Sequence, residues 1–138
     1  LLSIATKAFC FLLFAFCSSS LIFASMKLIA NGRIWIETTH GPFLGYGRVE
    51  LLQKIGELGS LRKAAAAMKI SYRQAWDFVD QMNKRTDKPL VIFERGGKNG
   101  GGASLTPEGE KAIALFNELD TAFRKFLTTA VADLNKRK

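Results

Sequence analysis

The hydrophobic residues between positions 49 and 82 recur at the intervals of amphipathic helices, and they predict three helices in succession. The first helix carries Val49, Leu51, Leu52, Ile55 and Leu58. The second is short and rich in alanine, and the third spans residues 71–84. In the third helix, Ala75, Val79 and Met82 follow an i, i+4, i+7 spacing, so we expect them to face a small core.

Polar residues at the starts of the second and third helices match the preferences of helix N-caps. Ser60 precedes the alanine run, Ile70 marks the turn, and Ser71 with Gln74 completes a Ser-x-x-Gln capping box. Alanines at the crossing allow two short helices to approach closely, as a helix-turn-helix requires. The alternative is an amphipathic helical hairpin with a solvated charged face.

A β-hairpin is predicted over residues 89–105. Residues 89–95 are rich in β-branched and aromatic residues, residues 96–102 form a glycine-rich loop, and residues 103–105 return as a second strand. Thr106 and Pro107 then begin a helix as its N-cap and its first residue. This order predicts a winged helix-turn-helix, which is a mainly α fold with a small β-hairpin wing and a long C-terminal helix.

Positive charge is concentrated on the predicted helix-turn-helix and wing. The 138 residues carry a net charge of +8, and residues 60–102 hold nine basic and four acidic residues. Residues 26–59 and residues 103–138 carry a net charge of only +1 each. A basic region of this kind is the electrostatic footprint of a nucleic-acid-binding surface.

The wing, residues 95–103, combines glycines with the basic residues Arg95 and Lys98. Glycines let such a loop lie close to a phosphate backbone, and the basic residues attract it. The loop has neither Gly-x4-Gly-Lys-Ser/Thr nor Gly-x-Gly-x-x-Gly after a strand, so the two nucleotide-binding fingerprints are not met. A plain flexible loop is the remaining alternative.

In a helix-turn-helix, the N-terminal residues of the second helix meet base edges in the major groove. Arg73 suits guanine and Gln74 suits adenine, because each side chain can form two hydrogen bonds to its base. The full set of expected DNA contacts is Ser60, Arg62, Lys63, Ser71, Tyr72, Arg73, Gln74, Asp77, Arg95, Lys98 and Asn99.

Residues 47 to about 129 resemble the N-terminal DNA-binding domain of the ModE molybdate-responsive regulators and, more distantly, the winged helix domain of LysR-type regulators. The resemblance rests on residues 59–67, residues 70–77, Met82-Asn83, the wing and Leu105-Thr106-Pro107-x-Gly109. It implies a DNA-binding transcriptional regulator, usually dimeric, with residues 71–74 in the groove and the wing beside them. Because the sequence ends at Lys138, we expect a short, single-domain form with no molybdate-binding domain and no cofactor.

The last helix, from Pro107 to about Leu134, has an apolar stripe that is wider than one compact domain needs. We expect part of the stripe to pair with the same helix of a second chain, which would give a two-fold dimer for a palindromic site. The expected dimerisation residues are Phe116, Leu119, Phe123, Phe126, Leu127 and Leu134. The alternative is a helix folded onto its own domain.

The N-terminal segment, residues 1–25, is strongly apolar and has three interpretations. The favoured one is that translation begins at Met26, the first methionine, so that residues 26–138 are the DNA-binding domain and the protein is cytoplasmic and nucleoid-associated. The second is a membrane anchor over residues 8–25, and the third is a cleaved signal peptide.

Residues 34–36, Ile-Trp-Ile, predict a strand that pairs near the wing or with a partner chain, and residues 40–42 are expected to break it. Trp35 and Trp76 are expected to pack in the core or at its edge rather than to stack on bases.

The acidic residues are scattered, and the sequence shows no catalytic triad and no metal-ligand spacing, so we expect a binding protein rather than an enzyme. The alternative function is a winged-helix protein-interaction module without DNA readout.

Replacing Lys98 with alanine should weaken binding to all DNA sequences alike and lower the salt slope of log K by about one unit, because one phosphate contact is lost. Lys136→Ala, in the C-terminal tail, is the control with the same charge change. Duplex binding measured over a range of salt concentrations checks this, and an unchanged slope would mean that the wing tip stays off the DNA.

Overall fold

A computed structural model of the chain describes residues 26–94 and 101–137. Its elements, in chain order, are β1 (Trp35–Thr38), β2 (Gly41–Gly45), α2 (Tyr46–Leu58), α3 (Leu61–Ala67), α4 (Tyr72–Asn83), β3 (Val91–Phe93), β4 (Ala103–Leu105) and α5 (Pro107–Lys136). The chain divides into two compact units. One is Gly32–Phe123, and the described residues of the other are Met26–Asn31 and Arg124–Arg137.

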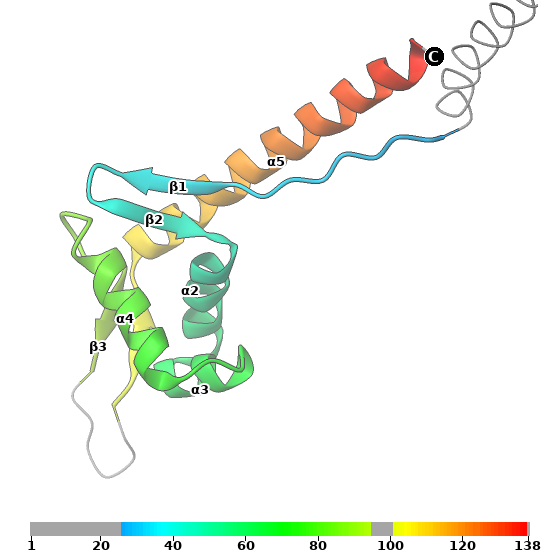
Figure 1. Cartoon of the computed structure of the whole chain (residues 1–138). Coiled ribbons are helices and arrows are strands. Elements are labelled where there is room, and N and C mark those ends of the chain that lie inside the picture. The colour runs from blue at the N-terminus through cyan, green and yellow to red at the C-terminus, as the bar shows by residue number, and fades with distance from the viewer. Residues whose placement is uncertain (1–25, 95–100, 138) are drawn as a thin grey trace, which may run out of the picture. The chain divides into compact units, whose positions relative to one another are not determined.

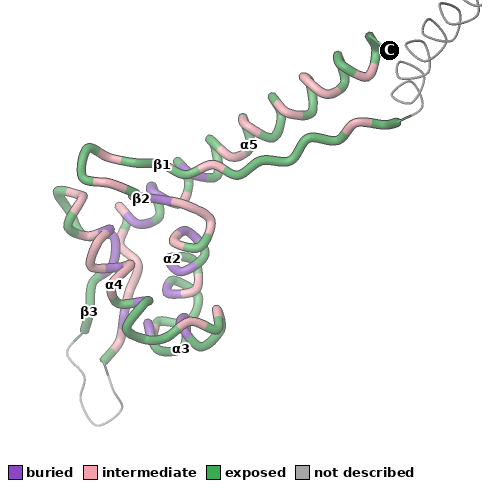
Figure 2. Tube along the Cα trace, viewed as in Figure 1, coloured by how far each residue is buried: buried purple, intermediate pink, exposed green. Residues whose placement is uncertain are grey.

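The core of the Gly32–Phe123 unit lies between α2, α3 and α4, whose inward faces are buried (Figures 1 and 2). As predicted, Ala75, Val79 and Met82 of α4 are fully buried. They meet the buried face of α2 and the alanines of α3, Ala64 and Ala65. Among the described residues, no polar or charged side chain is buried, so packing of apolar groups holds these helices together.

The predicted helix-turn-helix is confirmed, including both of its N-caps. The Ser60 hydroxyl accepts a hydrogen bond from the Lys63 amide at 3.4 Å, and the Ser71 hydroxyl accepts one from the Gln74 amide at 3.1 Å. Between the helices, Lys69 adopts a left-handed conformation with φ of 56°. This conformation costs a non-glycine residue roughly 1–2 kcal/mol, and it lets the chain turn directly from α3 into α4.

The predicted wing hairpin forms, although β3 is shorter than the expected strand. Val91 lies opposite Leu105, and Phe93 lies opposite Ala103. The Asn83 side chain joins the end of α4 to this hairpin. Its Oδ1 accepts hydrogen bonds from the amides of Leu90 and Val91 at 2.8 and 3.2 Å, and its Nδ2 donates to the Val91 carbonyl at 2.8 Å. The start of β3 is therefore fixed to the helix that precedes it.

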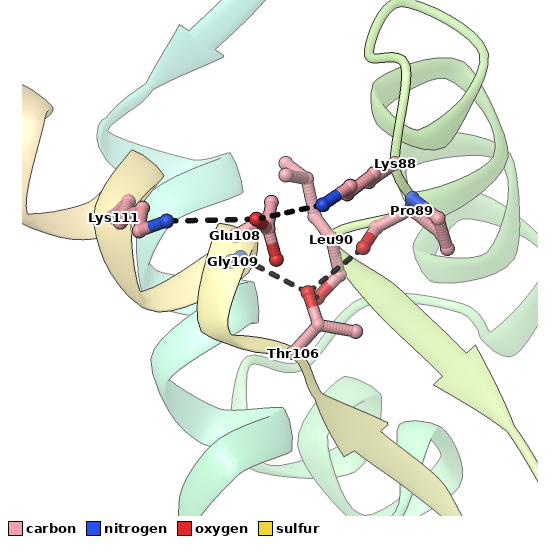
Figure 3. A network of polar contacts seen from close by, with 7 residues as sticks. All are labelled: Lys88, Pro89, Leu90, Thr106, Glu108, Gly109 and Lys111. Carbon is pink, nitrogen blue, oxygen red and sulfur yellow. Dashed lines mark hydrogen bonds and ion pairs between the residues drawn. The ribbon is translucent and has the colours of Figure 1, made fainter.

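Thr106 caps α5 as predicted and also ties this helix to the start of β3 (Figure 3). Its hydroxyl accepts a hydrogen bond from the Gly109 amide at 3.1 Å and lies 2.8 and 3.0 Å from the carbonyl oxygens of Pro89 and Leu90. Lys88 and Lys111 flank Glu108 beside this junction.

The N-terminal strand is confirmed, but its predicted partner is wrong. β1 pairs antiparallel with β2, so residues 41–45 form a strand where the sequence predicted a break. Two arginines hold this hairpin by its backbone. Arg48 of α2 donates to the carbonyls of Pro42 and Phe43, and Arg85, in the turn after α4, donates to those of Pro42 and His40. Leu44 fills the core beneath it and is 1% exposed.

In the second unit, residues 26–31 run along the C-terminal part of α5. The Asn135 side chain holds this segment by its backbone, because its Oδ1 accepts from the Leu28 amide at 3.1 Å and its Nδ2 donates to the Leu28 carbonyl at 3.2 Å.

The interpretations of residues 1–25 fall outside the described residues. Within residues 26–94 and 101–137, no helix has the length and apolar character needed to span a membrane.

Gly109→Ala should destabilise the Gly32–Phe123 unit. A Cβ at Gly109 would lie 2.4 Å from Leu105 Cδ1 and 2.5 Å from the Leu90 carbonyl oxygen, so the junction between β3, β4 and α5 would have to open. We expect a loss of about 1–3 kcal/mol in the free energy of unfolding, measured by chemical denaturation.

The matched control is Gly47→Ala in α2, where a new Cβ meets no described atom within 4 Å. This change should be neutral or stabilise the protein by up to about 1 kcal/mol, because alanine loses less conformational entropy in a helix. Equal stabilities for the two variants would contradict the tight packing at Gly109.

Candidate nucleic-acid interface

A groove of about 720 Å³ lies between the start of α3, the first turns of α4 and the base of the wing. Its walls include Ser60, Arg62, Lys63, Tyr72, Trp76, Phe93 and Glu94. The three walls come from separate segments of the chain and are held together locally. The Ala103 amide donates to the Gly59 carbonyl at 3.1 Å, which fixes β4 beside the start of α3, and Asn83 fixes β3 to α4.

The predicted contact residues divide into two groups in the structure. Ser60, Arg62, Lys63 and Tyr72 line the groove together. Four others, Ser71, Arg73, Gln74 and Asp77, lie on the first turns of α4 or at its cap but do not line the groove. Most of the two groups are exposed, and Ser60 and Asp77 are half-buried. Arg95, Lys98 and Asn99 lie outside the described residues, so their predicted contacts stay predictions.

Among the described residues that line the groove, the charged ones are two cations and one carboxylate. Arg62 and Lys63 are exposed on the first turn of α3, and Glu94 faces them from the end of β3. Ser104 donates a hydrogen bond to Glu94 Oε1 at 3.3 Å, so the carboxylate is held against the wing. In the part of the chain that the structure describes, no group of His, Cys, Asp and Glu residues is arranged to hold a metal ion.

Sequence analysis missed Trp76, Phe93 and Glu94 as groove residues. The tryptophans were expected in the core or at its edge. Neither lies in the core, since Trp35 is 64% exposed and Trp76 is 42% exposed, and packing at the edge is the alternative that is left. The i, i+4 spacing of Tyr72 and Trp76 was the available signal, because it places both rings on one side of α4. Phe93 could be assigned to the groove only once the register of the wing was known.

Arg48 supports α4 from the side away from the groove lining. Its Nη2 donates to Gln81 Oε1 at 2.7 Å, and its guanidinium lies over the Phe78 ring at 5.4 Å. Partial burial, together with the nearby charge of Arg85, lowers the pKa of Arg48 from its ordinary value. The guanidinium stays charged at neutral pH and links α2 to the side of α4 that carries Phe78 and Gln81.

Among the described residues, only part of the apolar stripe of α5 is buried. Phe116 is 2% exposed and contacts the Tyr46 ring edge-on, so its expected place among the dimerisation residues is wrong. Farther along the helix, Leu119, Phe126 and Leu134 are 44%, 66% and 51% exposed, and Phe123 and Leu127 are half-buried. The exposed part of the stripe therefore begins after Phe116.

Comparison with known proteins agrees with this geometry. The model of the bacterial regulatory helix-turn-helix proteins of the LysR family matches residues 47–110. The chain is 43% identical over 95 residues to the molybdenum-pterin-binding protein MopB of Rhodobacter capsulatus, an alignment that covers 69% of this chain and 35% of that protein. Residues 47–110 are thus a helix-turn-helix domain of the LysR-type bacterial regulators.

Two further relatives narrow this class. The chain is 35% identical over 104 residues to the molybdenum transport protein ModE of Azotobacter vinelandii, covering 75% of this chain and 38% of that protein. It is 42% identical over 85 residues to the transcriptional regulator ModE of Haemophilus influenzae, covering 62% and 33%. The domain is of the ModE type, and the chain spans about a third of the length of these relatives.

Proposed function

We propose that this chain is a sequence-specific, DNA-binding transcriptional regulator. The recognition helix, residues 71–84, enters the major groove, and the wing, residues 95–103, contacts the backbone or the minor groove. The observation that carries the proposal is the groove itself, which joins the start of α3, the exposed start of α4 and the base of the wing in one ModE-type domain. Because bacterial chromosomal DNA lies in the cytoplasm, the proposed location is cytoplasmic and nucleoid-associated.

The proposed contacts fall into two classes. Arg62 and Lys63 are placed to neutralise phosphates, which gives affinity for any duplex and a strong dependence on salt. Arg73 and Gln74 are exposed at the start of α4 and are placed to read base edges, which gives sequence preference. The proposal includes neither catalysis nor a cofactor, and the molybdenum named for the relatives is not carried over to this chain.

We further propose that two chains pair through α5. The residues that face the core, Ala112 and Phe116, continue as Leu119, Phe123 and Phe126 at alternating spacings of three and four, which is the pattern of a helix–helix seam. A two-fold dimer would present two α4 helices to a palindromic site, and linking two weak half-site contacts raises the affinity for the whole site.

Replacing Arg73 with alanine tests the readout. On a duplex selected from a random pool by repeated binding, we expect a loss of about 1–3 kcal/mol and relaxed base choice at one position, because a bidentate contact is removed. Binding to a random duplex should change much less. Fluorescence anisotropy, titrated at two or more salt concentrations, measures both.

Lys111→Ala removes the same charge from an exposed residue outside the groove, and it should leave both affinities nearly unchanged. Equal weakening on selected and random duplexes would reassign Arg73 to a phosphate contact. If the unmodified protein binds no duplex in a salt-dependent manner, the proposed function fails, and the protein-interaction alternative takes its place.

Glutamates at Phe126 and Leu134 should convert dimers to folded monomers, because two carboxylates would be brought into an apolar seam. Both side chains are more than half exposed in the single chain, so the fold does not depend on them. Thr121→Glu, on the other side of α5, is the control. Sedimentation at tens of micromolar gives the mass, and an unmodified protein that is monomeric yet binds a two-half-site duplex tightly contradicts the pairing.

A further inference from the structure

Two aromatic side chains of α4 line the groove although the core makes no use of them. Tyr72 is 52% exposed and Trp76 is 42% exposed, whereas Ala75 and Val79 beside them are fully buried. Because the two rings are four residues apart, they lie on the same side of the helix, one turn above the other. Large exposed apolar groups that gather on one surface of a small domain usually mark a binding site.

The setting of the rings limits what they can bind. Arg62 and Lys63 line the same groove and outnumber Glu94, its one described carboxylate, so a polyanion is attracted to the place where the rings are exposed. A purely apolar protein partner would have to strip water from these two cations, which disfavours it. The combination of aromatic rings, two cations and the first turns of a recognition helix fits a duplex whose major groove carries an apolar group.

The edges of base pairs in the major groove offer only one apolar group, the 5-methyl group of thymine. Cytosine carries only a hydrogen at C5, so an aromatic surface in contact with the methyl distinguishes the two pyrimidines. We propose that Tyr72 and Trp76 read thymine in the bound site through its 5-methyl group. This inference rests on the proposed function, since it requires α4 to lie in the major groove.

The two rings have separate places in this contact. Tyr72 is the first residue of α4, next to the cap formed by Ser71, so its ring is at the end of the helix that enters a major groove first. Trp76 lies one turn farther along and lines the same groove. Phe93 lines this groove from the wing hairpin. Two neighbouring thymines are within the span of one helical turn.

The test uses deoxyuridine, which keeps the base pair and removes only the methyl group. A duplex is first selected from a random pool by repeated binding to the full chain. Each thymine is then replaced singly by deoxyuridine, and the dissociation constant is measured by fluorescence anisotropy. We expect at least one thymine in each half-site at which the replacement weakens binding about fourfold, the effect of exposing one buried methyl-sized group.

The expected loss depends on the rings. Trp76→Ala and Tyr72→Ala should each bind the selected duplex more weakly, and at the sensitive thymine the deoxyuridine effect should disappear in one of them or in the double variant. Tyr72→Phe keeps the ring and should keep the effect. Leu115→Ala, at an exposed apolar residue of α5 outside the groove, should also keep it.

Two results overturn the inference while leaving DNA binding intact. One is tight binding that deoxyuridine changes at no position. The other is a deoxyuridine effect of the same size in the Tyr72→Ala, Trp76→Ala double variant as in the unmodified protein. Failure of the proposed function looks different, because no duplex would then be bound at all. Circular dichroism of each variant confirms that it is folded. If a truncated variant does not fold, the deoxyuridine scan of the unmodified protein still decides, because an effect at no position overturns the inference.

Discussion

The close approach of α3 and α4 is the constraint on which the rest of this surface depends. The distance between two packed helices follows from the side chains at their contact, and alanine permits the smallest separation of the residues that also favour helix. Ala64 and Ala65 on α3 and Ala75 on α4 are at most 2% exposed. A larger side chain at any of them would push α4 outward. The groove walls formed by the two helices would then separate.

The wing hairpin is positioned relative to these packed helices by polar contacts with backbone groups. Asn83 at the end of α4 holds the start of β3, and Thr106 at the start of α5 holds the same segment from the other side. The Gly59 carbonyl, just before α3, receives the amide of Ala103. The reading surface is thus assembled from three segments that are each fixed at their ends. The first turns of α4, which contribute to this surface, keep exposed side chains that are not part of the core.

The helix-turn-helix could be predicted from sequence because each of its features is local. A cap such as Ser71, an apolar spacing such as that of Val79 and Met82, and a Thr-Pro helix start act within one or two turns. The wing hairpin was found for the same reason, by a glycine-rich loop between two short apolar runs. Caps and periodicity also gave the correct chain order of these elements.

The parts that sequence analysis missed depend on contacts between distant residues. The strand over residues 41–45 contains two glycines and a proline, which are poor strand formers, and it is held by Arg48 of α2 and by Arg85 in the turn after α4. The composition of this strand does not predict its contacts with those two arginines. The burial of Phe116 was missed likewise, because a stripe on one helix does not show where its own domain ends and a free surface begins.

Asn83 illustrates how such a fold can change its DNA specificity over evolution. All three of its hydrogen bonds go to backbone groups of Leu90 and Val91, so the clamp does not depend on which side chains the wing carries beyond those two buried positions. Ile92, Phe93 and Glu94 are exposed and can be exchanged without loosening the joint. A gene duplicated from this one could therefore acquire a new target site by altering the wing and the outer face of α4, while inheriting the scaffold unchanged.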